Sequence, residues 1–343
     1  MKEAITKIKD QVKDAKQICI TSHKNPDGDA VGSSLALYLF LRKIHPQVKV
    51  VLPNKYPSFL EWMPHQDEIL FFDQNNSDSK NWIASSNLIF SLDYNDLSRV
   101  GNMQSCLEES KANFILIDHH QQPASYPTVC LSQPEIGSTC EMIYEVLEQW
   151  DKNLMDESIA TCIYTGIMTD TGSFRFPLTS SRTHQIIGEL INLGAKNSAI
   201  HQQTFDTNSL NKLQLLGTAL ANLKLVDTYN TAYISLSQEE LNQHHFQKGD
   251  TEGFVNYGLS VQGVDFAVIF IENKEEGIIK ISFRSKGDFD VNQYARKYFN
   301  GGGHKNAAGG RSEFNLEETI EKFLATLPIE KNNSKVSSTK QKI

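Results

Sequence analysis

The chain has 343 residues, of which 39% are hydrophobic and 22% are charged, a composition typical of a globular protein with room for two domains. Its 41 acidic and 33 basic residues give a formal net charge of −8. This balance argues against a protein that grips long nucleic-acid duplexes, because such proteins carry clustered Lys and Arg. The five cysteines have no Cys-x-x-Cys spacing, and the longest apolar run is too short to cross a bilayer. We therefore expect a cytoplasmic protein without disulfides and without a membrane partner.

In the first half of the chain, short apolar runs alternate with helical periods. The runs cover residues 17–21, 48–52, 68–72, 87–92 and 113–117. The clearest helical period covers residues 30–44. Strands that alternate with helices predict a doubly wound α/β fold, in which a mainly parallel sheet is covered on both faces. Ligand sites in such folds lie beyond the carboxyl ends of the strands.

The second half begins with helical patterns and continues with another alternating region. Helical patterns cover residues 182–193, 198–205 and 209–225, and strand-like runs cover 231–236, 265–272 and 277–284. The last residues are rich in Lys, Ser and Asn, which is typical of disorder. We therefore predict an N-terminal α/β domain over residues 1–185, a helical linker over 186–225, a smaller α/β domain over 226–328 and a disordered tail over 329–343.

A polar island follows the first predicted strand, at His23, Asp27 and Asp29. Carboxylates and neutral imidazoles are the side chains that bind divalent cations such as Mn²⁺. The alternative is structural, because Asp29 could cap the helix that follows and Asp27 could shape the turn. Both interpretations remain open for each aspartate taken alone.

Asp118, His119 and His120 form a second island, directly after the apolar run of residues 113–117. Three ionisable residues at the end of a buried strand would bury charge unless they are paired or bind metal. A solvated loop that happens to contain two histidines is the alternative.

Two more carboxylates belong to the same pattern. Asp93 follows the run of residues 88–92, where turn chemistry is the usual explanation for a single aspartate. Asp170 lies at the end of an apolar helix predicted over residues 156–169. A capping-box pattern at residues 138–141 predicts that another helix starts there. The four negative charges of these carboxylates would offset two divalent cations. Together with the two imidazoles, they predict a dinuclear metal site made of His23, Asp27, Asp29, Asp93, His119 and Asp170.

These motifs occur in the order found in a known family. The sequence resembles the DHH phosphoesterase superfamily, and within it the NrnA-type oligoribonucleases (nanoRNases) and pAp phosphatases that carry a DHH-associated C-terminal domain. The resemblance covers residues 15–327 and rests on four motifs: His23-Lys24-Asn25-Pro26-Asp27-Gly28-Asp29, Asp93-Tyr94-Asn95-Asp96, Asp118-His119-His120 and Asp170-Thr171-Gly172. Two further segments, residues 283–286 and 301–309, resemble the arginine strand and the glycine-rich substrate loop of that subgroup.

The resemblance implies a role for each metal-binding residue. His23 and Asp27 would bind one ion, Asp29, His119 and Asp170 the other, and Asp93 would bridge both. The ions would be two Mn²⁺, with Mg²⁺ or Co²⁺ as alternatives. His120 would face the scissile phosphate as a catalytic residue beside Asp93, and Asp118 would orient His119.

The resemblance also implies a substrate site on the second domain, facing a cleft between the domains. Consecutive glycines let backbone amides approach an anion, and a guanidinium matches phosphate geometry. The residues implied are Arg284, Ser285, Gly302, Gly303 and His304.

The implied activity is hydrolysis of short RNA or DNA oligonucleotides to mononucleotides, and of pAp to AMP, by a hydroxide that two metals activate. Two alternatives remain open at this point. One is an inorganic polyphosphate or pyrophosphate hydrolase of exopolyphosphatase type, and the other is a nucleotide-binding sensor without catalysis. A homodimer is compatible with the sequence, although nothing in the composition requires it.

Overall fold

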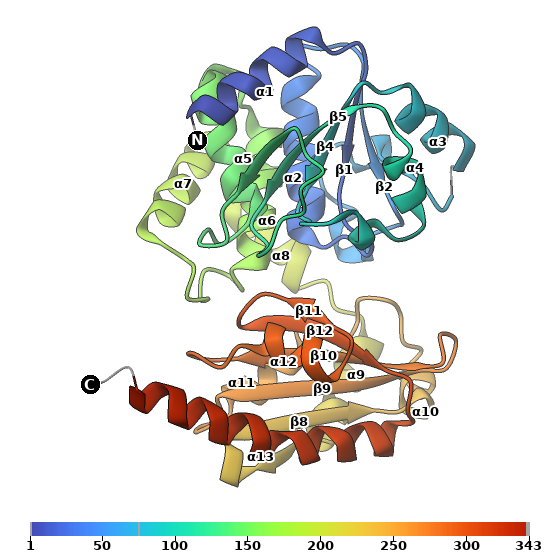
Figure 1. Cartoon of the computed structure of the whole chain (residues 1–343), viewed down its shortest axis with the longest axis vertical. Coiled ribbons are helices and arrows are strands. Elements are labelled where there is room, and N and C mark those ends of the chain that lie inside the picture. Colours follow the sequence, from blue (N-terminus) through green and yellow to red (C-terminus); the bar gives the residue numbers. More distant parts are fainter. Residues whose placement is uncertain (1, 75, 341–343) are drawn as a thin grey trace. The chain divides into compact units, whose positions relative to one another are not determined.

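A computed structural model of the protein describes residues 2–74 and 76–340. Contacts within the chain divide it into two units, Met1–Thr207 and Asn208–Ile343. Within the described residues, each unit contains one six-stranded sheet covered by helices (Figure 1).

The sheet of the N-terminal unit is entirely parallel. Its strands are β1 (Ile18–Thr21), β2 (Val48–Leu52), β3 (Leu70–Phe71), β4 (Leu88–Leu92), β5 (Asn113–Asp118) and β6 (Val129–Ser132). They are ordered β3-β2-β1-β4-β5-β6, and each neighbouring pair is parallel. This is the doubly wound arrangement that the sequence predicted. The strand order reverses next to β1, so β1 and β4 flank the point where such folds place ligands.

Helices cover both faces of this sheet, as the side-chain alternation along the strands requires. Ile18 and Ile20 of β1 belong to the core cluster beneath the helices α1, α2, α5, α6 and α7, whereas Cys19 belongs to the cluster beneath α3 and α4. The helix bounds are α1 (Lys2–Asp14), α2 (Gly28–Leu41), α3 (Asn76–Ser85), α4 (Gln104–Glu108), α5 (Thr139–Asp151), α6 (Glu157–Asp170), α7 (Ser181–Asn192) and α8 (Asn197–Phe205).

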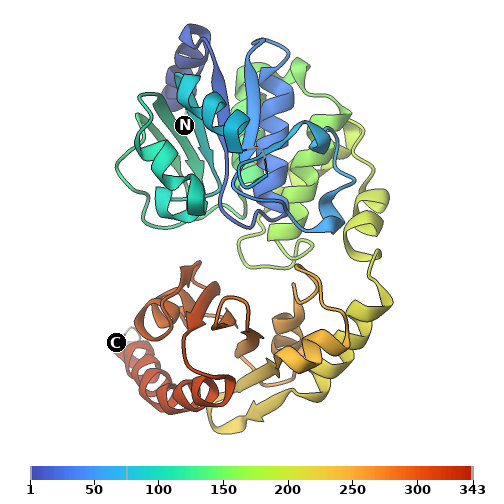
Figure 2. The same ribbon diagram turned by 90° about the vertical axis from the view of Figure 1, so that its right-hand side faces the viewer.

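Helix α2 is the central helix of this unit. All of its residues are buried, because it packs against the sheet and against α5 and α6, which are the green helices beside the blue one in Figure 2. A helix that is apolar all round is typical of such an enclosed position. Its first turn therefore carries the polar side chain of Asp29 into the interior, at the carboxyl ends of the strands.

The C-terminal unit has a mixed sheet. Its strands are β7 (Lys224–Val226), β8 (Thr231–Leu236), β9 (Phe266–Asn273), β10 (Ile278–Ser285), β11 (Gly302–Gly303) and β12 (Ala307–Ser312), in the order β11-β12-β10-β9-β8-β7. Only β8 and β9 are parallel among the neighbouring pairs of this sheet's described strands. One face packs aromatic residues such as Phe266 and Phe283 against α12 (Val291–Tyr298) and α13 (Leu316–Lys340). The other face packs against α9 (Leu210–Ala221), α10 (Gln238–Gln243) and α11 (Phe254–Ser260). A smaller second α/β domain is confirmed.

The boundary between the two units falls inside the predicted linker of residues 186–225. The helix α8 belongs to the first unit and α9 to the second. That this segment acts as a linker stays a prediction. Helix α13 continues to Lys340, where the sequence predicted a disordered tail from residue 329, and residues 341–343 of that tail lie outside the described residues. Extending a helix costs little once its earlier turns are packed, as they are around Phe323 and Leu327. Among the described residues, no helix is both long enough and apolar enough to cross a membrane.

Candidate active site

The site lies where three neighbouring parallel strands end. His23 follows β1, Asp93 follows β4, and His119 and His120 follow β5, and β4 lies between β1 and β5 in the sheet. Asp93 is the centre of this group. Its Oδ2 lies 3.5 Å from Nε2 of His23, and its Oδ1 lies 3.5 Å from Nε2 of His119. One carboxylate thus faces two imidazoles, one through each oxygen.

The first candidate metal position is formed by His23, Asp27 and Asp93, whose ligand atoms lie within 4.8 Å of one another. Asp27 serves two purposes here. Its Oδ1 accepts hydrogen bonds from the amides of Asp29 and Ala30 at 3.1 Å and so caps α2. Its Oδ2 lies 3.9 Å from Nε2 of His23. The capping and metal-binding interpretations are therefore compatible for Asp27.

The second candidate position is formed by Asp29, Asp93 and His119, again with ligand atoms within 4.8 Å of one another. Nε2 of His119 lies 3.8 Å from Oδ2 of Asp29 and 3.3 Å from Oδ2 of Asp170. The structure thus brings together all six side chains that the sequence singled out. Their roles as metal ligands stay a prediction.

Both histidines are held in the orientation that metal binding needs. Nδ1 of His23 bonds to the carbonyl of Lys24 at 2.9 Å, and Nδ1 of His119 bonds to the carbonyl of Ile136 at 3.1 Å. A carbonyl can only accept, so Nδ1 carries the proton in each ring. In the neutral ring, Nε2 then keeps its lone pair, and it points toward the carboxylates. Such an outer hydrogen bond is the usual way to fix the tautomer of a ligating histidine.

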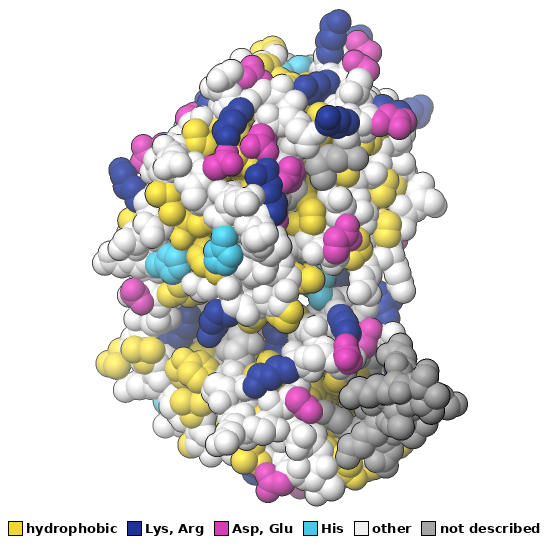
Figure 3. Space-filling view, turned by 90° about the vertical axis from the view of Figure 1, so that its left-hand side faces the viewer, with side chains coloured by type: hydrophobic (Ala, Val, Ile, Leu, Met, Phe, Trp, Pro, Cys, Tyr) yellow, Lys and Arg dark blue, Asp and Glu magenta, His cyan; other side chains and the backbone are white. Residues whose placement is uncertain are grey.

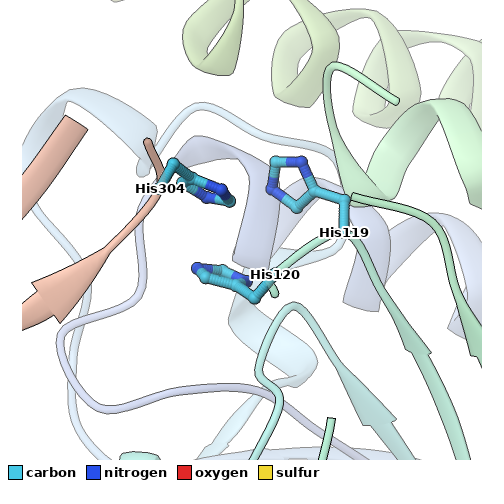
Figure 4. A group of neighbouring side chains, drawn as sticks. All are labelled: His119, His120 and His304. Carbon is cyan, nitrogen blue, oxygen red and sulfur yellow. The ribbon is translucent and has the colours of Figure 1, made fainter. Parts of the chain in front are cut away.

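Asp118 has a different partner from the one expected. Its Oδ1 accepts a 2.7 Å hydrogen bond from Nδ1 of His120, and it is fully buried. The expectation that Asp118 orients His119 is wrong, because Asp118 turns toward His120, two positions further along the chain. Nδ1 of His119 donates instead to the carbonyl of Ile136. The rings of His119 and His120 lie edge to face with centroids 5.2 Å apart (Figure 4). Nδ1 of His120 is thus bonded to a carboxylate, whereas Nδ1 of His23 and of His119 is bonded to a backbone carbonyl.

The backbone at Asp93 is strained. Its φ angle is 63°, in the left-handed region, and its amide donates to the Ile117 carbonyl at 3.2 Å. Aspartate tolerates this conformation better than most residues do, yet it costs free energy that surrounding contacts must offset. The strain turns the chain sharply after β4 and directs this side chain between the two imidazoles.

Burial and charge shift the pKa values of the site strongly. Burial raises the pKa of Asp29 well above its usual value, and the charges of Asp93 and Asp170 raise it further. Burial also acts to raise the pKa of Asp93, but hydrogen bonds with His119 and His23 outweigh it and hold that pKa well below its usual value. For both histidines, burial lowers the pKa, while the neighbouring carboxylates raise it more, so that the net pKa is well above 6.5.

The donor set fits divalent cations. Asp29 and Asp93 are almost fully buried and meet Asp27 and Asp170 in one cluster, so their charges need positive compensation. Protons on the two histidines supply part of it in the absence of metal. Cations at the two positions would supply it directly, and mixed oxygen and imidazole ligation suits Mn²⁺.

Sequence inspection missed the start of α5 as a part of this site. The amides of Thr139 and Cys140 donate to the two oxygens of Asp29 at 2.6 and 2.8 Å. The Thr139 hydroxyl donates to Oδ1 of Asp93 at 3.0 Å. The capping-box pattern correctly indicated a helix start at this place, since Ser138 is the N-cap, but it could not show which side chains the free amides face.

In the C-terminal unit, the predicted substrate residues lie at one end of β10, β12 and β11. Arg284 of β10 is opposite Ala307 of β12, and Gly303 of β11 is opposite Ala308. Ser285 accepts a hydrogen bond from the Asn306 side chain at 2.9 Å and donates to the Phe289 carbonyl at 2.7 Å. The strand pairing thus gathers Arg284, Ser285, Gly302, Gly303 and His304. Their role in substrate binding stays a prediction.

The glycines in this segment have a packing reason that the sequence did not show. A Cβ at Gly301 would lie 2.0 Å from the Gly309 carbonyl oxygen, and one at Gly303 would lie 2.5 Å from that of Ala307. The amide of Gly303 donates to Oδ1 of Asn292 at 3.1 Å. That amide is therefore bonded within the protein, and the binding of an anion by this segment stays a prediction.

Arg296 of α12 is a second residue that the sequence did not single out. Its Nε donates to the same Asn292 oxygen at 3.0 Å, and a Cβ at Gly302 would lie 3.6 Å from its Nη2. Its guanidinium is therefore fixed beside the glycine segment. The sequence pattern that could have indicated this contact is the spacing of Asn292 and Arg296, which lie four residues apart on one helix face.

Comparison with known proteins agrees with this geometry. A model of the DHH family N-terminal domain matches residues 17–167, and a DHHA1 domain model matches residues 229–328. The structure of an exopolyphosphatase-related protein from Bacteroides fragilis is 38% identical, with a TM-score of 0.93 and 98% of each chain covered.

Two curated proteins are similar along most of their length. The bifunctional oligoribonuclease and PAP phosphatase NrnA of Bacillus subtilis is 28% identical over 312 residues, covering 90% of this chain and 93% of that protein. The protein of the same name from Thermus thermophilus is 28% identical over 308 residues, covering 90% of this chain and 88% of that protein. The fold, the site and these matches define a hydrolase of the metal-dependent phosphoesterase class. The chain belongs to the DHH family and carries a DHHA1 domain.

Proposed function

We propose that this protein hydrolyses short oligonucleotides to mononucleotides and pAp to AMP, using two Mn²⁺. The observation that carries the proposal is the position of Asp93, with one oxygen 3.5 Å from His23 and the other 3.5 Å from His119. Such an arrangement suits a carboxylate shared by two cations. His23 and Asp27 would complete one position, and the other would be completed by Asp29, His119 and Asp170.

Cations bound there would supply Lewis acidity, which lowers the pKa of a water molecule and stabilises charge on phosphate oxygens. The protein contributes the remaining chemistry. His120 donates Nδ1–H to the buried carboxylate of Asp118, which leaves Nε2 to donate a proton to the substrate. Asp118 holds the imidazole ring in the orientation that this donation requires. Arg284 binds phosphate in the part of the substrate remote from the cleaved bond.

Small substrates fit the charge of the molecule. On the face shown in Figure 3, acidic and basic side chains are interspersed over the N-terminal unit, and the formal net charge of the chain is −8. A long duplex would require a continuous basic surface. Two- to five-nucleotide substrates require only a few phosphate contacts.

Inorganic polyphosphate is the second candidate substrate, because one similar structure is that of an exopolyphosphatase-related protein. Nucleotides are favoured by the match to the two NrnA proteins over about 90% of this chain. The glycine and arginine segments of the C-terminal unit also favour nucleotides, because they resemble the nucleotide-binding type of second domain. A sensor without catalysis would bind nucleotides without metal.

One experiment tests these candidates together. Purified protein is incubated with Mn²⁺ and, in separate reactions, with RNAs of two to five nucleotides, pAp, linear dinucleotides, pyrophosphate or polyphosphate. We expect hydrolysis of the oligonucleotides and pAp, and its loss in chelator. Faster hydrolysis of polyphosphate than of every oligonucleotide and of pAp would contradict the proposal. Nucleotide binding that persists in chelator, together with no hydrolysis of any substrate in Mn²⁺, would identify a sensor. Light scattering of the purified protein tests whether it forms a homodimer.

A further inference from the structure

The first turn of α5 makes three hydrogen bonds to the candidate metal-binding carboxylates. The Thr139 amide donates to Oδ2 of Asp29 at 2.6 Å, and the Cys140 amide donates to Oδ1 of the same residue at 2.8 Å. The Thr139 hydroxyl donates to Oδ1 of Asp93 at 3.0 Å. Thr139 and Cys140 are fully buried, so water does not compete for these bonds.

The position of the helix start explains the two amide bonds. Ser138 is the N-cap, and its hydroxyl accepts from the Glu141 amide at 3.1 Å. The amides of Thr139 and Cys140 are the first two of the helix, where no carbonyl of the same helix is available to accept their hydrogen bonds. They therefore need an acceptor from another part of the chain. The carboxylate of Asp29 takes both, and the positive end of the helix dipole stabilises its charge.

Thr139 differs from its neighbours because it contacts both carboxylates. Its amide binds Asp29 at the start of α2, and its hydroxyl binds Asp93 after β4. An ionised carboxylate accepts hydrogen bonds and cannot donate them, so the Thr139 hydroxyl is the donor to Asp93. A β-branched side chain has few rotamers, and this geometry fixes the hydroxyl in one direction.

Close packing prevents the Asp29 carboxylate from turning away. Helix α6 also approaches this carboxylate closely, since a Cβ on Gly166 would lie 2.9 Å from Oδ1 of Asp29 and 2.1 Å from Sγ of Cys140. Only a glycine leaves room for the sulfur and the carboxylate together. Asp29 is therefore held between the amides of α5 and the backbone of α6.

We propose that Thr139 is a positioning residue that sets the distance and orientation between Asp29 and Asp93, and thereby the affinity for the metal ion they share. This inference rests on the metal site proposed above. Groups that orient metal ligands typically change metal affinity or activity by about 10- to 100-fold when removed. We expect the effect in the affinity for Mn²⁺ and in kcat, since Thr139 contacts ligands and not substrate.

The test compares Thr139→Val, which removes the hydroxyl at nearly constant shape, with Thr139→Ser, which keeps it. Thr165→Val is the matched control, because Thr165 is also buried and its hydroxyl donates only to the Thr161 carbonyl of its own helix at 2.8 Å. Mn²⁺ affinity is measured by titrating the metal-free full-length proteins in a calorimeter, and the spectrum of bound Co²⁺ reports the ligand geometry. Turnover of a dinucleotide gives kcat and KM.

We expect Thr139→Val to bind Mn²⁺ about 10- to 100-fold more weakly and to have an altered Co²⁺ spectrum. Its kcat should fall while its KM stays within about threefold, and Thr139→Ser and Thr165→Val should resemble the wild type. Unchanged Mn²⁺ affinity in Thr139→Val would overturn the inference, as would an equal loss in Thr139→Ser or in Thr165→Val.

If Thr139→Val does not fold, Thr139→Ala takes its place, and failure of both variants to fold would show that Thr139 is structural and would overturn the inference. Wild-type protein that binds no metal would instead refute the proposed function itself.

Discussion

The substitution Gly166→Ala tests the packing that encloses the candidate site. The added Cβ would lie 2.1 Å from Sγ of Cys140 and 2.9 Å from Oδ1 of Asp29. Non-bonded heavy atoms prefer separations of about 3.5–4.0 Å, so the sulfur would have to move by about 1.4 Å. It has little room, because Sγ of Cys140 also lies 3.6 Å from the carbonyl oxygen of Asp29 and 4.0 Å from that of Cys162.

The size of the effect follows from two opposing terms. Overpacking of a buried site typically costs about 1–3 kcal/mol, whereas alanine stabilises a helix interior by about 0.5–1 kcal/mol relative to glycine. With the sulfur enclosed on both sides, we expect a net loss of about 2 kcal/mol. For a unit of this size, that loss lowers the melting temperature by about 4–8 °C.

Thermal unfolding in chelator measures this loss without a contribution from metal. Gly188→Ala is the control, because Gly188 is also inside a helix, yet a Cβ there meets nothing within 4 Å. That variant should be more stable than the wild type by about 0.5–1 kcal/mol. A Gly166→Ala protein as stable as Gly188→Ala would refute the close approach of α2, α5 and α6 at the site.

Three further predictions concern chemistry. Asp93→Asn should reduce turnover at least about 1,000-fold, which corresponds to about 4 kcal/mol in activation free energy. It should also weaken Mn²⁺ binding, because an amide cannot replace a carboxylate shared by two ions. Wild-type kinetics in this variant would contradict the central role of Asp93. Arg284→Ala should raise KM for a dinucleotide with kcat within about threefold, as measured by steady-state kinetics, and a fall in kcat alone would contradict a binding role. Metal-free protein should lose stability as pH rises above 6.5, the usual pKa of histidine, since the pKa values of His23 and His119 are well above it when folded. Their contribution is complete below pH 6.5 and is lost as pH rises through the folded pKa values, so Mn²⁺ affinity, measured by titration, should increase over the same range. A pH-independent difference in melting temperature between the wild type and His23→Gln would contradict this assignment.

The sequence alone was sufficient for the fold class and for most strands. The runs at residues 17–21, 87–92 and 113–117 correspond to β1, β4 and β5, because a strand buried on both faces is a continuous apolar segment that local inspection detects. The strand β6 was missed, since its residues Val129–Ser132 are few and include the exposed Cys130. The strands β11 and β12 were missed because a glycine-rich segment reads as a flexible loop, whereas here pairing with β10 makes it a strand.

Residue type and order also determined which side chains enter the candidate site. A polar residue directly after an apolar strand is carried to the carboxyl edge of a parallel sheet, so the three groups that follow β1, β4 and β5 converge there, and Asp170 joins them from the end of α6. Which atom meets which was decided only by the tertiary structure. Asp118 turns to His120 and not to His119, and Thr139 links Asp29 with Asp93 across segments far apart in the chain. These partners depend on the strand order and on the approach of α2, α5 and α6. Local sequence patterns carry no information about either.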